Sequence, residues 1–385
     1  MARGAGGTPM SATTLADQVR HARANHHTLR ICGAGTWLSA GRPAATTGTL
    51  DLSGHTGIVE YVPGDLTLTA RAGTSLTEIA SATRAEGHWL ALDPHGAGAG
   101  TIGATVATAS FGPLASAFGT PRDHVLGCEF VSGTGDVIRA GGRVVKNVAG
   151  FDLVRLTTGA WGTLGAITEV SLRLRARPEA DETLVVAIGS ELKEAFAARV
   201  ATWMRTSALT PFAAELVSPT LARQLGHDGG ALMLRWGGNA SFASAAATEA
   251  ATLGDSTRAR ETAWTDLARA EPVGAVVFRA STLPSRLPAL WARASSFAEG
   301  AGGFAHASVS RGIVRVVVPT EGSSPDAVRK GIQDLASTCT LVCEQAGATL
   351  WPMFDCTRSS DALRAGVKRA FDPDGVMNPG LLGLP

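Results

Sequence analysis

The chain has 385 residues, of which 45% are hydrophobic and 17% charged, and its formal net charge is +1. This near-neutral balance gives no indication of a surface that binds nucleic acid or of an acidic tail. The length is enough for two or more domains, each with its own hydrophobic core. No uninterrupted apolar stretch approaches the roughly 20 residues that a membrane-spanning helix requires.

The N-terminus and the cysteines indicate a cellular compartment. Residues 1–14, MARGAGGTPMSATT, lack the apolar segment of a secretory signal. The five cysteines are odd in number and scattered, which is typical of a reducing compartment rather than of a disulfide framework. We therefore expect a soluble cytoplasmic protein that neither binds nucleic acid nor spans a membrane.

The first half of the chain is rich in glycine and alternates short strands with helical patches. Apolar residues at i, i+3 and i+4 predict two helices, and Thr74 or Ser75 precedes the second of them as an N-cap with Glu78 three or four residues on. The expected helices are residues 14–24 and 76–85, and the expected strands are 29–31, 57–62, 66–73, 124–132 and 136–140.

After Arg177-Pro178 the composition changes to longer alanine-rich helical stretches that alternate with strands. This alternation predicts an antiparallel sheet covered on one side by helices. The expected helices are 190–205, 240–252, 284–298 and 325–338, and the strands include 183–189, 276–281 and 312–319. Residues 371–385, with three prolines and three glycines, predict an irregular tail that packs on the rest of the protein.

Three segments of the first half leave backbone amides accessible between small residues. They are GAGT at 33–36, the run at 93–112, and GAWGTLGAIT at 159–168. Converging amides can bind a phosphate without lysine, whereas the structural alternative is a set of turns and a bulged strand packed against a helix. None of the segments matches the GxxxxGK[ST] or the strand-to-helix GxGxxG pattern, which disfavours a nucleotide triphosphatase and a Rossmann dehydrogenase.

These segments carry a family resemblance. GAGT at 33–36, TIGATVAT at 101–108, PRDHVLG at 121–127, VVKNVAGFDL at 144–153 and GTLGAITEVSLRL at 162–174 together resemble the FAD-binding domain of the vanillyl-alcohol oxidase / p-cresol methylhydroxylase superfamily. The tail FDPDGVMNPG at 371–380 resembles the C-terminal signature of its 2-hydroxy-acid dehydrogenase branch. VVKNVAGFDL and the short second half are most similar to the smaller FAD-binding subunit of bacterial glycolate oxidase.

The resemblance implies an α+β fold in three parts. A two-subdomain PCMH-type FAD-binding domain covers residues 1–178. An α+β, ferredoxin-like cap that binds substrate or partner covers 179–360, and a C-terminal tail, 361–385, returns to the flavin on the FAD domain.

The cofactor implied by the resemblance is FAD, held noncovalently because residues 30–41 contain no histidine for covalent attachment, with His95 and Cys128 as remote alternatives. In relatives the loop that matches 33–36 wraps the pyrophosphate. The chain departs from the family pattern at Ala104-Thr105 and at Ala160-Trp161-Gly162. The cofactor-binding residues implied are Gly33, Ala34, Gly35, Thr36, Trp37, Pro94, Gly100, Thr101, Ile102, Gly103, Thr105, Thr108, Gly112, Asp123, Gly162, Thr163, Gly165, Ile167 and Asn378.

Oxidation of a 2-hydroxy acid needs a cation for the carboxylate and a base for the hydroxyl proton. By resemblance Arg279 supplies the cation, with an ordinary surface or interface arginine as the alternative. His306 is the candidate base or a hydrogen-bonded structural histidine. Lys146 either places positive charge near the flavin or is a solvated lysine.

No metal site is expected, because the second half contains no HxH, HExxH or HxxxH pair. Cys339, Cys343 and Cys356 lack iron–sulfur spacing, so buried thiols are the favoured interpretation.

Three functions remain open from the sequence. The favoured one is an FAD-binding subunit of a complex that oxidises glycolate or D-lactate and passes electrons to an iron–sulfur partner beside a larger FAD-binding subunit. Such a complex is compatible with peripheral association at the inner face of a membrane. The second is a self-sufficient FAD-dependent D-2-hydroxy-acid dehydrogenase, and the third is a non-catalytic scaffold subunit.

Overall fold

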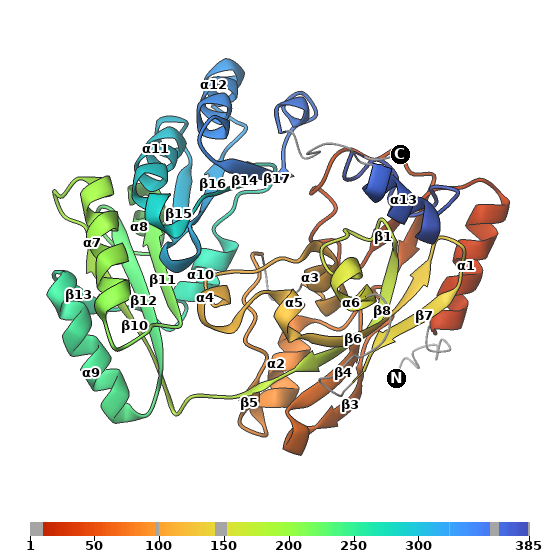
Figure 1. The fold of residues 1–385 in the computed structure, drawn as a ribbon, viewed down its shortest axis with the longest axis horizontal. Helices are drawn as coiled ribbons and strands as arrows, with labels where there is room; N and C mark the ends of the chain where they lie inside the picture. The colour runs from red at the N-terminus through yellow and green to blue at the C-terminus, as the bar shows by residue number, and fades with distance from the viewer. Residues whose placement is uncertain (1–10, 97–99, 143–151, 323, 355–361, 384–385) are drawn as a thin grey trace, which may run out of the picture.

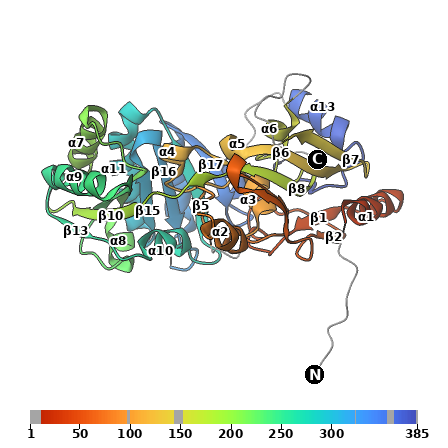
Figure 2. The ribbon, with the colours of Figure 1, turned by 90° about the horizontal axis from the view of Figure 1, so that it is seen from below.

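The computed structural model describes residues 11–96, 100–142, 152–322, 324–354 and 362–383. They form two lobes that lie side by side along the long axis of the molecule (Figures 1 and 2), each built on its own β-sheet. The elements from the first half of the chain make one lobe, and those between β10 and β17 make the other, which we call the cap.

The N-terminal lobe contains a five-stranded sheet in the order β3-β4-β8-β6-β7, with two small two-stranded sheets, β1-β2 and β5-β9. Its strands are β1 Leu29–Cys32, β2 Gly48–Asp51, β3 Ile58–Val62, β4 Thr67–Arg71, β5 His88–Trp89, β6 Val125–Ser132, β7 Val137–Gly141, β8 Gly165–Arg173 and β9 Arg175–Ala176. Its helices are α1 Ala12–Ala24, α2 Leu76–Arg84, α3 Ile102–Thr108, α4 Ala115–Phe118, α5 Pro121–His124 and α6 Leu153–Thr157. Ser75 caps α2 by accepting the amide of Glu78.

The cap contains an eight-stranded antiparallel sheet in the order β13-β10-β12-β11-β15-β16-β14-β17. Its strands are β10 Ala180–Ala187, β11 Ala213–Val217, β12 Ala231–Gly238, β13 Ser256–Arg258, β14 Val276–Ser281, β15 Phe304–Ser308, β16 Ile313–Val318 and β17 Thr340–Gln345. Its helices are α7 Lys193–Thr206, α8 Pro219–Gln224, α9 Ala240–Ala250, α10 Ala263–Arg269, α11 Leu287–Gly300 and α12 Pro325–Ala336.

All the strands and helices expected from apolar patterning are confirmed to within a few residues at their ends. The expectation that helices cover the cap sheet on one side only is wrong. The face opposite α7 and α11 carries Val217, Val277 and Val317, which pack with residues of α8 and α10 in a separate buried cluster. Both faces are apolar at this end of the sheet because successive strand residues point to opposite sides and both sets are hydrophobic there.

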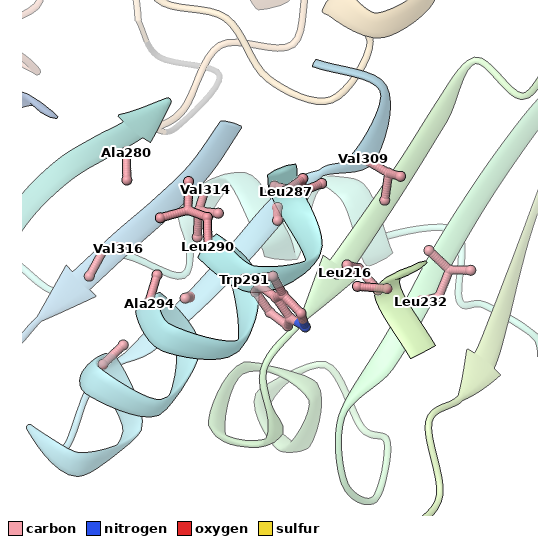
Figure 3. Packing of buried hydrophobic residues seen from close by; sticks show 14 of the residues in the cluster. Leu216, Leu232, Ala280, Leu287, Leu290, Trp291, Ala294, Val309, Val314 and Val316 are labelled. Atoms are coloured by element: carbon pink, nitrogen blue, oxygen red, sulfur yellow. The ribbon is translucent and has the colours of Figure 1, made fainter. Parts of the chain in front are cut away.

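The main core of the cap lies between its sheet and α11. Trp291 is 1% exposed and lies between the helix and the strands, close to Leu216 and Leu232 (Figure 3). Its indole Nε1 has no hydrogen-bond partner among the described residues. Trp291 therefore stabilises the cap through the packing of its ring rather than through its N–H group.

The C-terminal tail returns to the N-terminal lobe. Helix α13, Ala362–Phe371, lies beside the lobe that contains α1 and β7 (Figures 1 and 2). Beyond it, Val376 and Met377 are buried in the core of that lobe, and Met377 forms an isolated bridge with Leu29. We propose that the division between the FAD domain and the cap lies near residue 178, between the last strand of one lobe and the first of the other. The division expected at residue 360 lies outside the described residues.

Replacement of Trp291 by alanine should lower the free energy of unfolding by about 3–5 kcal/mol, because it leaves a large cavity under α11. Trp291→Phe keeps a ring and removes an N–H that has no described partner, so it should cost only about 1–2 kcal/mol. Urea titration of the two variants measures the difference. Equal losses would contradict the assignment of ring packing as the main contribution.

Candidate functional site

A groove in the N-terminal lobe, with an empty volume of about 690 Å³ that includes the part open to solvent, is lined by the glycine segments that the sequence singles out. The predicted residues that line it are Gly33, Ala34, Gly35, Thr36, Trp37, Thr101, Gly103, Thr108, Gly162, Gly165, Ile167 and Asn378. The lining residues that the sequence reasoning missed are Arg30, Ile31, Cys32, Leu38, Leu52, Ala72, Ala104, Ala107, Trp161, Ala166 and Leu381.

The loop that follows β1 is held open by small residues. Gly35 has φ +78°, a conformation that favours glycine, and a Cβ at Gly33 would lie only 2.8 Å from the hydroxyl oxygen of Thr101. Thr101 caps α3 by accepting the amide of Ala104, so the glycine loop and the start of α3 meet closely. The amides of Ala34 and Thr36 donate no hydrogen bond to another described residue. They are free for an anionic ligand.

The segment 159–168 approaches the C-terminal tail closely. A Cβ at Gly162 would lie 2.8 Å from the side-chain amide nitrogen of Asn378 and 2.8 Å from Cδ1 of Ile31. Gly162 has φ +67°, and the preceding Trp161 has φ +55° without being glycine. Backbone strain of this kind persists only where surrounding contacts enforce it. The glycine is therefore required by the meeting of the tail, β1 and this turn at one edge of the groove.

Asn378 provides those contacts. Its side-chain Oδ1 accepts the amide of Ile31 at 3.0 Å, and its Nδ2 donates to the carbonyl of Trp161 at 2.8 Å. Its own amide donates to the carbonyl of Leu29 at 3.0 Å, and its φ is +44°. One buried side chain thus joins three segments that are remote in sequence.

A buried ion pair between Lys368 and Asp372 also fixes the tail. Nζ of Lys368 lies 2.5 Å from Oδ2 of Asp372 and donates to the carbonyls of Thr163 and Met377. Asp372 also accepts the amides of Val376 and Met377. A buried charge pair that makes all these hydrogen bonds is rigid. It therefore fixes the position of the tail relative to the turn at Thr163, beside the groove.

Arg30 places a positive charge in the groove. Its Nη2 lies 3.2–3.4 Å from the carbonyls of Trp37, Leu38 and Ala40, while its buried Nη1 has no hydrogen-bond partner among the described residues. Burial lowers its pKa, and no carboxylate of the described part of the chain forms an ion pair with it. In the sequence, Arg30 is simply a polar residue between the apolar Leu29 and Ile31 of a short strand, and nothing in this pattern marks it as a ligand-binding residue.

The residues present fit a dinucleotide. Among the described residues the lining contains no aspartate or glutamate, and burial raises the pKa of the Cys32 thiol, so the guanidinium of Arg30 is the only charged group that they contribute to it. Free loop amides, glycines that leave no room for side chains and one unpaired cation together suit the diphosphate of FAD.

Several predicted residues lie outside this lining. Pro94, Gly100 and Thr105 line a second cavity beside the groove, which shares Thr36 and Trp37 with it. The other predicted cofactor-binding residues that lie outside the lining have structural roles of their own. Ile102 is buried in the core, Gly112 leaves room for Asp93, Asp123 accepts the amide of Thr120 at the start of α5, and the hydroxyl of Thr163 donates to the carbonyl of Ala160. Lys146 lies outside the described residues.

Three charged residues of the cap, Glu271, Arg315 and Glu344, line one side of the second cavity, and Arg279 lies behind them. Arg279 and Arg315 are paired with Glu344, and Arg315 also contacts Glu271. Burial opposes the ionisation of Glu344, but Arg315 and Arg279 outweigh it and lower its pKa. Burial and the charge of Arg315 hold the pKa of His95 well below its usual range, so this imidazole is neutral. Arg279 and His306 do not line the groove.

His306 is buried and held by Glu215. Its Nδ1 lies 2.5 Å from Oε1 of Glu215, whose Oε2 accepts the hydroxyl of Ser308 at 2.7 Å. The ring centroids of His306 and His95 are 5.3 Å apart. The arrangement supports either sequence interpretation, because a carboxylate orients a catalytic imidazole and a structural one alike.

The cysteines of the second half lie in the cap. The Cys343 side chain belongs to the main hydrophobic cluster, and Sγ of Cys339 lies 3.1 Å from the carbonyl of Leu335. Cys356 is outside the described residues. Within the part of the chain that the structure describes, no group of three or more His, Cys, Asp or Glu side chains is placed to hold a metal ion, and no described helix is long and apolar enough to cross a membrane.

Asp93 should give the protein a measurable pH dependence. Burial raises its pKa to about 7, although the amide of Leu114 donates to it. Between about pH 4 and pH 7 the folded protein therefore keeps a proton that the unfolded chain loses, and stability falls as the pH rises. Asn at position 93 does not titrate. The free energy of unfolding of Asp93→Asn, relative to that of the wild type, should therefore increase from about pH 5 to about pH 8.

Urea titration at both pH values measures this gain. Asp255→Asn, at an exposed aspartate, is the matched control and should follow the wild type. Parallel pH profiles for the wild type and Asp93→Asn would contradict the raised pKa.

Comparison with known proteins agrees with this geometry. Residues 8–141 match the family model described as FAD binding domain. The chain is similar to glycolate oxidase subunit GlcE of Escherichia coli K12, with 42% identity over 171 residues, 44% of this chain and 49% of that subunit. It is also similar to glycolate oxidase subunit GlcD of Bacillus subtilis 168, with 36% identity over 154 residues, 40% of this chain and 33% of that subunit. The matches thus span half or less of the length of these relatives.

Solved structures share the fold at low sequence identity. P-cresol methylhydroxylase with substrate bound superposes with a TM-score of 0.75 at 14% identity, covering 97% of this chain and 87% of that one. An alkyldihydroxyacetonephosphate synthase superposes with a TM-score of 0.71 at 15% identity, covering 96% and 76%. Residues 8–141 are therefore similar to an FAD-binding domain, and the chain shares the fold of p-cresol methylhydroxylase.

Proposed function

We propose that this chain is the FAD-binding subunit of a complex that oxidises a small 2-hydroxy acid, such as glycolate or D-lactate, and passes the electrons to an iron–sulfur partner. The observation that carries the proposal is the groove, in which three glycine segments, Asn378 and the unpaired Arg30 surround a space that suits a dinucleotide. The names of the relatives support the substrate class. Besides the glycolate oxidase subunits they include a D-2-hydroxyglutarate dehydrogenase and a D-lactate dehydrogenase.

The roles of individual residues follow from the groove. The free amides of Ala34 and Thr36 and the guanidinium of Arg30 bind the diphosphate, and the glycines at 162 and 165 bring backbone against the cofactor. When bound, FAD supplies a two-electron acceptor for the conversion of a 2-hydroxy acid into a 2-oxo acid. Pro94, Gly100 and Thr105 face the second cavity, where they shape the wall beside Trp37.

The alternative, a self-sufficient dehydrogenase, assigns the substrate carboxylate to Arg279 and the hydroxyl proton to His306. Arg279 is already paired with Glu344, and His306 is buried against Glu215. The cation that this alternative needs for the substrate carboxylate is thus already engaged, which favours a subunit whose complex carries out the oxidation elsewhere, whereas the contact of His306 with Glu215 is compatible with either role. The scaffold alternative leaves the free amides and the unpaired Arg30 of the groove without a role.

Removal of the charge of Arg30 should weaken FAD binding. A charge-assisted hydrogen bond contributes about 1.5–3 kcal/mol, so Arg30→Gln should raise the dissociation constant of FAD roughly 10- to 100-fold. Equilibrium titration of the apoprotein with FAD, followed by flavin fluorescence at low and high salt, measures this. The wild-type affinity should fall with salt more steeply than that of the variant.

Arg42→Gln is the matched control, since Arg42 also contacts a backbone carbonyl, that of Phe354, but does not line the groove. It should bind FAD as the wild type does. Unchanged affinity and unchanged salt dependence in Arg30→Gln would place the diphosphate away from this residue.

The purified chain, loaded with FAD, should keep its visible flavin absorbance when glycolate or D-lactate is added without oxygen. The complex isolated from the source organism should lose that absorbance under the same conditions. Rapid bleaching of the isolated chain would support the self-sufficient dehydrogenase. A folded chain that neither carries nor takes up FAD would overturn the proposed function.

A further inference from the structure

The cap sheet presents a row of two arginines and a histidine to the N-terminal lobe. His306, Arg315 and Arg279 lie at paired register positions on the neighbouring strands β15, β16 and β14. His95 of the N-terminal lobe lies against His306, and the guanidinium of Arg279 lies 5.1 Å from the ring centre of Phe111. Of this row, Arg315 lines the second cavity, which borders the cofactor groove at Thr36 and Trp37, while Arg279 and His306 lie next to it.

Glu344 reaches this row from the edge strand β17. Its Oε1 lies 2.7 Å from Nε of Arg279, and its Oε2 lies 2.7 Å from Nη1 of Arg315, so that one carboxylate spans both guanidinium groups. The side chain is 8% exposed, and the residue lines the second cavity. A small carboxylate entering the cavity meets Arg315 in its lining, and it reaches Arg279 only by taking the place of Glu344.

The geometry points to Glu344 as an internal counter-ion that occupies the carboxylate position of this cavity and excludes free carboxylates from it. The inference rests on the proposed function and deepens it, because it names the residue that prevents the subunit from taking a 2-hydroxy acid by itself. Glu344 is thus a specificity-determining residue.

The charges around the cavity are balanced without a ligand. Arg279 and Arg315 are matched by Glu344 and Glu271, and His95 is neutral. An external carboxylate either has to displace Glu344 into a poorly solvated site or has to become a third buried anion beside two cations. Both routes are costly, because burying an unpaired charge is strongly unfavourable.

The position of Glu344 is fixed by its backbone as well as by its side chain. Its carbonyl accepts the amide of Gly41 at 2.8 Å, which ties β17 to the segment that continues from the glycine loop. Arg311, whose guanidinium also lies over Phe111, donates to the carbonyl of Ala115 and does not line the cavity. Glu344 therefore has no competing cation to move to within the cavity lining.

The substitution Glu344→Gln removes the charge and keeps the shape, so it should convert the cavity into a carboxylate site. We expect acetate and glycolate to bind this variant at least about tenfold more tightly than the wild type, as judged by a rise in melting temperature with ligand concentration. Acetamide, the neutral analogue of acetate, should shift neither protein. In the FAD-loaded variant, acetate should also perturb the visible flavin spectrum.

Asp181→Asn is the matched control. Asp181 pairs with Arg235 at 2.6 Å on the same sheet, and neither residue lines the groove or the second cavity. This variant should gain no affinity for acetate.

Two outcomes would overturn the inference: saturable binding of acetate to the wild type as tight as to Glu344→Gln, or a folded Glu344→Gln variant that binds no carboxylate. If Glu344→Gln does not fold, the wild-type titration still decides, together with Glu344→Asp, which keeps the charge and should remain insensitive to acetate. The melting-temperature measurement does not require FAD. A colourless protein would therefore refute the proposed function, whereas a missing acetate effect in a flavin-loaded variant would refute only the role of Glu344.

Discussion

The side-chain amide of Asn378 is the contact on which the groove depends. It accepts the amide of Ile31 and donates to the carbonyl of Trp161, while its own amide donates to Leu29. The strand that leads into the glycine loop, the strained turn before β8 and the C-terminal tail therefore hold one another in place. Left-handed backbone at Trp161 and at Asn378 costs free energy, and it persists because these hydrogen bonds and the buried Lys368–Asp372 pair over-determine the local geometry.

A second constraint comes from the cap, whose sheet is apolar on the face that carries α7 and α11 and charged over part of the other. Charged strand residues are tolerated there because each is matched by a partner. Glu215 holds His306, and Glu344 spans Arg279 and Arg315. Loss of one partner from such an ion-pair network leaves an uncompensated buried charge. The two lobes consequently meet through specific polar contacts around His95 as well as through hydrophobic burial.

The sequence predicted the elements and most of the groove, because strand alternation, helix periodicity and runs of small residues are local signals. It could not say what each glycine makes room for. Gly162 leaves space for Asn378 beside the groove, whereas Gly112 leaves space for Asp93 away from it, and the two look alike in sequence. Arg30 was missed because the burial of its Nη1 and the absence of an acidic partner among the described residues arise only from tertiary packing. The helices on the second face of the cap were missed for the same reason, since alternating apolar residues do not reveal which helix covers them.

The groove and the second cavity are neighbours with opposite electrostatic character. The described residues give the groove one unpaired cation and no acid, which suits an anionic dinucleotide. The cavity lining already contains two carboxylates, Glu271 and Glu344, in contact with Arg315, so an added anion disturbs it. Thr36 and Trp37, which are uncharged, are the described side chains common to both. In the function proposed above, this difference in charge directs a diphosphate to one site and denies a small carboxylate the other, as suits a subunit that holds a flavin while its complex oxidises the acid elsewhere.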